Sequence, residues 1–145
     1  MNCTFCDKEN KSIRDRIIFE DNLVIAFPTN IPIVPGHILV CPSHHVSKID
    51  QLSEKELKAI VNLIIQLKEG LKKAFLVEGF NIAWNEGEIA GQAVDHLHIH
   101  IVPRKAGDEG IYGYDPRKFL YRPGSREISP EQELKEIAEL INKNL

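Results

Sequence analysis

The sequence predicts an α+β fold in which one long helix packs on a five-stranded antiparallel sheet, with a further helix at the C-terminus. Five short runs are rich in β-branched, aromatic and other apolar residues and are bounded by Gly, Pro, Asn or Asp. Most of these runs follow one another without an intervening helix, which favours antiparallel over parallel pairing. Two longer segments instead repeat apolar residues at spacings of three and four, which is the period of an amphipathic helix.

The expected strands cover residues 16–20, 23–27, 37–41, 80–84 and 96–102. Asp21 and Asn22 separate the first two runs and predict a hairpin turn. The dipeptide Pro35-Gly36 comes just before the third run, and Pro42 closes it. Proline and glycine interrupt regular structure, so these positions mark the ends of the strand.

The first expected helix begins after Ser53 and ends near Phe75. Ser53 with Glu56 three positions later is a capping-box pattern, in which each side chain bonds the other's backbone N–H. Gly79 follows soon after the proposed end of the helix. The apolar face comprises Leu57, Ile60, Ile64, Leu67 and Leu71.

The second expected helix covers about residues 129–144. We interpret Ser129 as its N-cap and Pro130 as its first helical residue, where the missing proline N–H costs nothing. Its apolar face comprises Leu134, Ile137, Leu140 and Ile141. The segment of about 106–126 is rich in Gly, Pro, Tyr and charged residues and predicts an irregular loop.

Composition limits the classes of function. The 145 residues suit one domain over 1–145, and 43% hydrophobic residues suffice for a core. A net charge of −3 argues against binding a long nucleic acid. No apolar run approaches the roughly 20 residues that span a bilayer. The N-terminus also lacks the features of a signal peptide, so we expect a cytoplasmic protein with no membrane partner.

Three histidines occupy every second position of the last expected strand. Side chains alternate between faces of a strand, so His96, His98 and His100 are predicted to share one face. The row has three interpretations: buried structural histidines, a metal site, or a catalytic nucleophile. Asn85 and Gln92 lie nearby among glycines and offer uncharged hydrogen-bond donors, which suits a nucleophile facing a phosphate.

The segment GQAVDHLHIHIVPR at 91–104 resembles the signature of the histidine triad family, and PGHILVCP at 35–42 resembles its second block. The resemblance runs from Cys3 to about Arg104. It implies a HIT-like fold, a homodimer, and an enzyme that hydrolyses or transfers nucleotides. The middle histidine, His98, would attack the α-phosphate of a dinucleoside polyphosphate or a nucleoside phosphoramidate and form a covalent nucleotidyl-histidine. No catalytic cofactor is then expected.

The resemblance also implies roles for other residues. His37 and His100 would flank the phosphate, and Asn85 and Gln92 would contact the phosphate or the leaving group. The ribose would lie near Thr29 or Asn30, where relatives often carry Asp or Asn. Many relatives have Ser or Thr in place of Ala93, a hydroxyl that assists the leaving group. The stretch at 103–108 resembles the branch that acts on dinucleoside polyphosphates.

A structural zinc site is a second expectation. In a reducing compartment Cys3 and Cys6 form a Cys-x-x-Cys metal half-site rather than a disulfide. Some members of the histidine triad family complete such a pair with two histidines, and the matching residues are His45 and His96. The adjacent His44 is the alternative to His45.

Two rival hypotheses remain. One is a metal-dependent hydrolase with His96, His98 and His100 as ligands of a catalytic metal. The other is a nucleotide-binding regulatory module that keeps the pocket but turns over little, which the residues at Ala93 and Thr29 leave open.

Overall fold

A computed structural model describes residues 3–110 and 127–145 of the chain. Of the loop expected at 106–126, only residues 106–110 therefore belong to the described part, where they form turns and bends. Within the described residues, no helix has the length and apolar character needed to cross a membrane.

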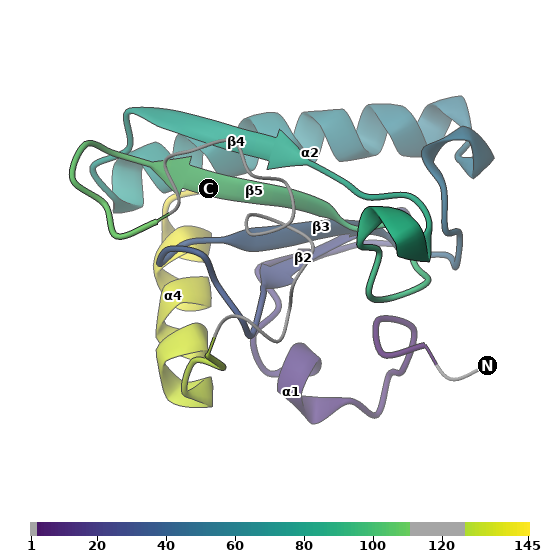
Figure 1. Cartoon of the computed structure of the whole chain (residues 1–145), viewed down its shortest axis with the longest axis horizontal. Coiled ribbons are helices and arrows are strands. Elements are labelled where there is room, and N and C mark those ends of the chain that lie inside the picture. The colour runs from purple at the N-terminus through teal and green to yellow at the C-terminus, as the bar shows by residue number, and fades with distance from the viewer. Residues whose placement is uncertain (1–2, 111–126) are drawn as a thin grey trace.

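The described residues form one five-stranded antiparallel sheet with two main helices, so the predicted α+β fold is confirmed. The strands pair in the order β1-β2-β3-β5-β4, which places β3 at the centre and β4 at one edge (Figure 1). Their bounds are β1 Phe19–Glu20, β2 Val24–Pro28, β3 Ile38–Pro42, β4 Gly79–Ala83 and β5 Ile99–Arg104.

The strand predicted at 96–102 begins later than expected, at Ile99. The chain bends at His96, because the Leu97 N–H donates to the Val46 carbonyl at 2.7 Å and not to a neighbouring strand. The strand predicted at 16–20 is likewise shorter, since only Phe19 and Glu20 pair in register with β2. The continuous histidine strand was therefore wrong at its N-terminal end.

Helix α2, Glu54–Ala74, confirms the long helix and its cap. The Glu56 N–H donates to Ser53 Oγ at 3.2 Å, and the Ser53 N–H donates to Glu56 Oε1 at 3.0 Å. The helix ends at Phe75, which adopts an extended conformation. Two 3-10 turns, η1 at Ile49–Gln51 and η2 at Glu88–Ala90, and the short helix α1 at Lys11–Arg14 were not predicted.

Helix α4, Glu131–Lys143, confirms the C-terminal helix but corrects its start. Ser129 is not the cap: its backbone N–H donates to the Asn30 carbonyl at 2.9 Å. Pro130 takes the N-cap position with a non-helical ψ of 138°. The helix packs through Leu134, Ala138 and Ile141, all buried.

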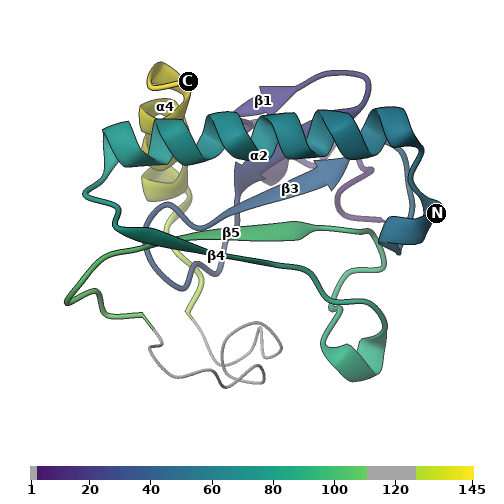
Figure 2. The same ribbon diagram turned by 90° about the horizontal axis from the view of Figure 1, so that it is seen from above.

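The sheet is covered on both faces. On one face, alternate residues of β2, β3 and β5 pack against α2 and α4 in the larger core cluster; Figure 2 shows α2 running along the sheet with α4 beside its C-terminal end. On the other face, the opposite set of alternate residues meets α1 and the N-terminal segment. Both sets are apolar, which explains why β2 and β3 read as continuous hydrophobic runs. This second face carries the candidate site.

Candidate active site

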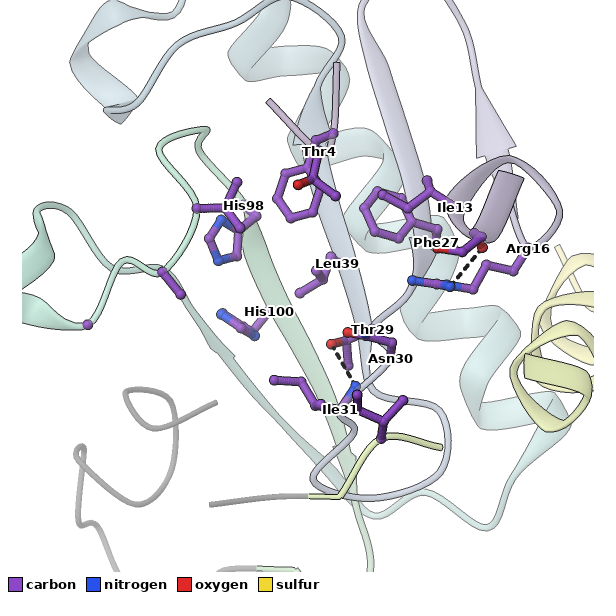
Figure 3. Close-up of a pocket in the computed structure, with 16 residues that line it drawn as sticks. Thr4, Ile13, Arg16, Phe27, Thr29, Asn30, Ile31, Leu39, His98 and His100 are labelled. Atoms are coloured by element: carbon purple, nitrogen blue, oxygen red, sulfur yellow. Dashed lines mark hydrogen bonds between the residues drawn. The ribbon is translucent and has the colours of Figure 1, made fainter. Parts of the chain in front are cut away.

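A cavity of about 480 Å³ opens on the sheet face opposite α2 (Figure 3). His98 and His100 line one part of it, and Thr29, Asn30 and Ala93 line it as well. Its other lining residues are Thr4, Phe5, Ser12, Ile13, Arg16, Phe27, Ile31, Leu39, Gly91, Val94 and Ile128. The cavity therefore joins imidazoles to a mostly apolar wall, the combination typical of a small-molecule site.

The His98 imidazole is held in a defined tautomer. Its Nδ1 lies 2.8 Å from the His96 carbonyl oxygen, which can only accept, so Nδ1 carries the proton. The lone pair is then on Nε2. Burial lowers the pKa of His98, although the bond to the His96 carbonyl opposes the shift. Burial is the larger effect and the net shift is downward, so the imidazole is neutral near pH 7 with its lone pair on Nε2, the form that acts as a nucleophile.

His37 and His100 form a hydrogen-bonded relay with a fixed direction. The Ile33 backbone N–H donates to His37 Nδ1 at 3.0 Å, so the proton of neutral His37 is on Nε2. His37 Nε2 lies 2.9 Å from His100 Nδ1 and donates to it. His100 therefore carries its own proton on Nε2 and is a donor there. His37 is fully buried behind His100 on the chain leading into β3, while His100 itself lines the cavity.

Asn85 and Gln92 occupy different surroundings. Asn85 is buried, and neither Oδ1 nor Nδ2 of its side chain has a hydrogen-bond partner within the described part of the chain. Asn85 follows the end of β4 by two residues, and Ala83, the last residue of β4, pairs with His100 of β5. A buried amide without a protein partner is costly, so both polar atoms of Asn85 can bond a group that enters from outside the chain.

Gln92 instead bonds the protein's own backbone. Its Oε1 accepts from the Gly87 N–H at 2.8 Å, and its Nε2 donates to the Ser47 carbonyl at 2.9 Å. The side chain thus ties the turn before the histidines to the segment after β3. The neighbouring Ala93 lines the cavity.

Thr29 and Asn30, the two residues considered for the ribose, follow β2 and line the cavity. Thr29 is buried, and its Oγ1 accepts from the Ile31 N–H at 3.3 Å (Figure 3). Asn30 is exposed, so its amide side chain is open to a ligand.

The four residues predicted for zinc converge in one cluster. Nitrogen and sulfur ligand atoms of Cys3, Cys6, His45 and His96 all lie within 4.8 Å of one another. His96 Nδ1 lies 3.5 Å from Cys3 Sγ and 3.3 Å from Cys6 Sγ, and His45 Nδ1 lies 3.5 Å from Cys6 Sγ. Tetrahedral zinc bonds imply sulfur–nitrogen separations of about 3.6 Å. The cluster therefore has a donor set and spacing that can hold a metal ion.

The surroundings of the cluster agree with that chemistry. His96 Nε2 donates to the Pro42 carbonyl at 2.9 Å, which leaves Nδ1 unprotonated and aimed at the thiols. Burial raises the pKa of the Cys6 thiol to about 11, and the neighbouring Cys3 acts in the same direction. A bound cation would favour the thiolate over the thiol form of Cys3 and Cys6. His44 does not join the cluster but pairs with Glu56 of α2.

Several cavity residues were missed by the sequence analysis. Phe5 lies between the two cysteines in sequence, and its ring makes edge contacts with His98 and Phe27 at centroid distances of 5.4 Å. The alternation of β2 and β3 contained a signal, because Phe27 and Leu39 fall on the face away from α2. No sequence pattern pointed to Arg16, because it precedes β1 in an ordinary charged stretch.

The fold and these side chains define a domain with a histidine-lined cavity: a neutral imidazole with an unprotonated Nε2, a second imidazole and a mostly apolar wall, next to a cysteine–histidine cluster that could hold a metal ion. A family model for the HIT domain matches residues 10–107. The chain belongs to this HIT domain family.

Individual relatives support the assignment. The chain is 39% identical over 106 residues to an uncharacterized HIT-like protein of Methanocaldococcus jannaschii, covering 73% of this chain and 81% of that protein. It is 33% identical over 145 residues to adenosine 5'-monophosphoramidase of Schizosaccharomyces pombe, covering 100% and 99%. It is 29% identical over 137 residues to bis(5'-adenosyl)-triphosphatase of Dictyostelium discoideum, covering 90% and 89%.

The fold is also similar to that of a solved structure. A HIT-like protein from Bartonella henselae superposes with a TM-score of 0.78 at 28% identity, covering 99% of this chain and 96% of that one. Two of the relatives above thus carry the names of enzymes that hydrolyse nucleotides, whereas the relative with 39% identity is uncharacterized.

Proposed function

We propose that the chain is a nucleotide hydrolase or nucleotidyl transferase that works through a covalent nucleotidyl-His98 intermediate. The observation that carries the proposal is the orientation of His98 in the cavity. Its Nδ1 proton is bonded to the His96 carbonyl, so the Nε2 lone pair is free to attack. Burial keeps this imidazole neutral by lowering its pKa.

The reaction proceeds in two displacements. His98 Nε2 attacks the α-phosphorus, an Nε2–P bond forms, and the bond from phosphorus to the leaving group breaks with its electron pair. Water or another acceptor then attacks the same phosphorus, the electron pair of the Nε2–P bond returns to Nε2, and the proton of the acceptor passes to the solvent. Phosphoryl transfer depends mainly on electrostatic support for the phosphoryl oxygens. We assign that support to the Nε2 proton of His100, held in place by His37.

Asn85, Gln92, Thr29 and Asn30 complete the proposed site. The buried, unpaired amide of Asn85 supports a contact with the phosphate or the leaving group. For Gln92 we propose a supporting contact at the edge of the site, since its amide already bonds Gly87 and Ser47. Thr29 and Asn30 line the cavity where a ribose would lie.

Dinucleoside polyphosphates are the substrates that we favour over nucleoside phosphoramidates. A polyphosphate leaves as a stable anion, whereas an amine leaving group must be protonated. Ala93 lines the cavity without a hydroxyl that could assist that protonation. The names of the Dictyostelium and Schizosaccharomyces relatives support the two substrate classes.

The test is a search for the intermediate. The protein is mixed separately with a dinucleoside triphosphate and with an adenosine phosphoramidate, quenched in base, and its intact mass recorded. One added nucleotidyl group is expected, more abundant with the dinucleoside triphosphate and absent in His98→Ala. His44→Ala is the matched control, because His44 lies outside the cavity lining and pairs with Glu56. Turnover without an adduct, even after single-turnover quenching, would refute the nucleophile.

The two rival hypotheses receive less support. Within the described residues, the only group of three or more potential ligand side chains that converges is Cys3, Cys6, His45 and His96, so the histidine triad does not itself gather around one metal position. A regulatory module with little turnover would have the same cavity, so the cavity does not distinguish it from an enzyme. Tight nucleotide binding with negligible turnover across a panel of nucleotides would favour that module over an enzyme.

We further propose that the cysteine–histidine cluster binds a structural zinc ion. Its spacing, its half-buried to buried setting and the bond from His96 to Pro42 support a closed four-ligand site. Elemental analysis of the purified protein should find about one zinc per chain, and Cys6→Ser should reduce it. Wild-type zinc content in Cys6→Ser would contradict the assignment.

A homodimer through the edge of the sheet is the assembly that we propose. Strand β4 lies at that edge, and Ile82 and Trp84 are 42% and 41% exposed there. Exposed edge strands pair readily with another strand. Light scattering should give twice the mass of the chain, and Ile82→Lys should shift it to the monomer mass. A monomeric wild-type protein would refute this assembly.

A further inference from the structure

Arg16 brings a buried cation to the same cavity that contains His98. The residue is only 4% exposed, and three hydrogen bonds fix its guanidinium. Nε donates to the Pro28 carbonyl at 2.8 Å, and Nη1 donates to the Ser12 carbonyl and to Glu131 Oε1, both at 2.7 Å. The plane of the guanidinium is therefore set by α4, the end of β2 and the α1 segment together.

The remaining nitrogen of this guanidinium is available to a ligand. Nη2 donates no hydrogen bond to any residue in the described ranges, and it is not among the fully enclosed polar atoms. Figure 3 shows the guanidinium beside Phe27 and directed toward the interior of the cavity. Its central carbon lies 5.9 Å from the centroid of the Phe27 ring. A charged donor next to apolar walls favours a ligand that brings an acceptor to this position.

The position of Arg16 relative to His98 identifies the part of the ligand that it would meet; this step rests on the proposed function. His98 and His100 lie on one side of the cavity, and Ile13, Phe27 and Arg16 lie on the other (Figure 3). A nucleotide with its α-phosphorus at His98 extends its nucleoside toward that second side. Apolar and aromatic walls suit the faces of a nucleobase, so Arg16 would face its polar edge.

We infer that Arg16 is a specificity-determining residue that selects nucleotides with a keto base, guanine in preference to adenine. Guanine presents the O6 acceptor at this edge, and Nη2 is the nitrogen of Arg16 that remains to donate to it. Adenine presents an amino group in place of O6. Arginine has no acceptor and does not deprotonate in proteins, so the adenine amino group and Nη2 would face each other as unpaired donors.

Equilibrium binding of three monophosphates tests this inference. GMP, IMP and AMP are titrated into the wild-type protein by calorimetry; IMP shares O6 and N7 with GMP but lacks its amino group. GMP and IMP should bind about tenfold more tightly than AMP. In Arg16→Gln, whose amide can pair with adenine, the ratio should fall to about one or reverse.

Two further variants separate specificity from folding. Glu131→Gln weakens the ionic support of Arg16 but keeps the guanidinium, so its preference for GMP should match the wild type. If Arg16→Gln fails to fold by circular dichroism, Arg16→Lys is used instead. Lysine retains the charge, but its three N–H donors cannot serve Pro28, Ser12, Glu131 and a base O6 together, so its preference should also fall.

The outcomes distinguish this inference from the proposed function. Equal affinity for GMP and AMP in a wild-type protein that still forms the His98 adduct would overturn the inference alone. An unchanged GMP preference in a folded Arg16→Gln or Arg16→Lys would overturn it as well. Failure of all three monophosphates to bind would overturn the proposed function together with it.

Discussion

His37 can be replaced in two ways that separate catalysis from stability. Its Nδ1 accepts from the Ile33 N–H, and its Nε2 donates to His100. The amide of His37→Asn reaches the position of Nδ1 and can still accept from Ile33, but it cannot reach His100. The amide of His37→Gln reaches the position of Nε2 and can still donate to His100, but it leaves the Ile33 N–H without an acceptor.

The magnitudes follow from these bonds. Without the donor from His37, the tautomer of His100 is no longer fixed. Loss of a partner that orients a functional imidazole typically lowers activity about 10–100-fold. We expect kcat for a dinucleoside polyphosphate to fall by that factor in His37→Asn, with little change in KM. An unpaired, partly buried N–H costs about 1–3 kcal/mol, so His37→Gln should lose that much free energy of unfolding while it keeps most of kcat.

Steady-state kinetics and urea unfolding of both variants measure these effects. We expect opposite patterns: low activity with near-native stability in His37→Asn, and lower stability with near-native activity in His37→Gln. Parallel losses of both properties in the two variants would refute the directional relay. So would a fully active His37→Asn.

Three further predictions concern other parts of the fold. Gly36→Ala should cost about 2–4 kcal/mol, because φ is +92° and a Cβ would lie 3.1 Å from Pro103 Cγ; a melting temperature within a degree of the wild type would contradict this. Asp108→Asn should cost about 1.5–3 kcal/mol at pH 7, because Arg104 donates two bonds to that carboxylate at 2.9 Å. Arg104 lowers the pKa of Asp108, so its contribution is complete above the unfolded value near 4 and is lost as the pH falls through the lower folded value. Unfolding at a series of pH values should show the Asn variant and the wild type converging in acid, and a constant difference would contradict the pairing. Phe5→Ala should raise KM several-fold for a nucleotide, because the ring contacts the cavity wall at Phe27; an unchanged KM would show that Phe5 does not contact the ligand.

The elements of the fold were largely predictable because each depends on local periodicity. The long helix has a capping box at Ser53 and an apolar stripe, and both are local features. Alternation along the strand predicted at 96–102 likewise placed His98 and His100 on one face and Ile99 and Ile101 on the other. The shorter β1 and the later start of β5 were not predictable, because pairing partners decide where a strand ends.

The candidate site was predictable only as a set of residues. The resemblance brought together His37, His98, His100 and the four cluster residues, but it did not include Arg16. Arg16 reaches the cavity through contacts with Pro28 and with Glu131, which is 115 positions away in sequence. No local pattern encodes a contact over that separation.

The sequence alone determined which residue types are available and which face of each element they occupy, since side-chain direction follows from the period of the backbone. Only the tertiary structure decided how the histidines divide their tasks. The chain bends at His96 because Leu97 bonds to Val46, and this bend turns His96 toward the cysteines while His98 and His100 remain at the cavity. Hydrogen bonds to backbone groups of Ile33, Pro42 and His96, in the geometry that the fold imposes, then fix the tautomers of His37, His96 and His98.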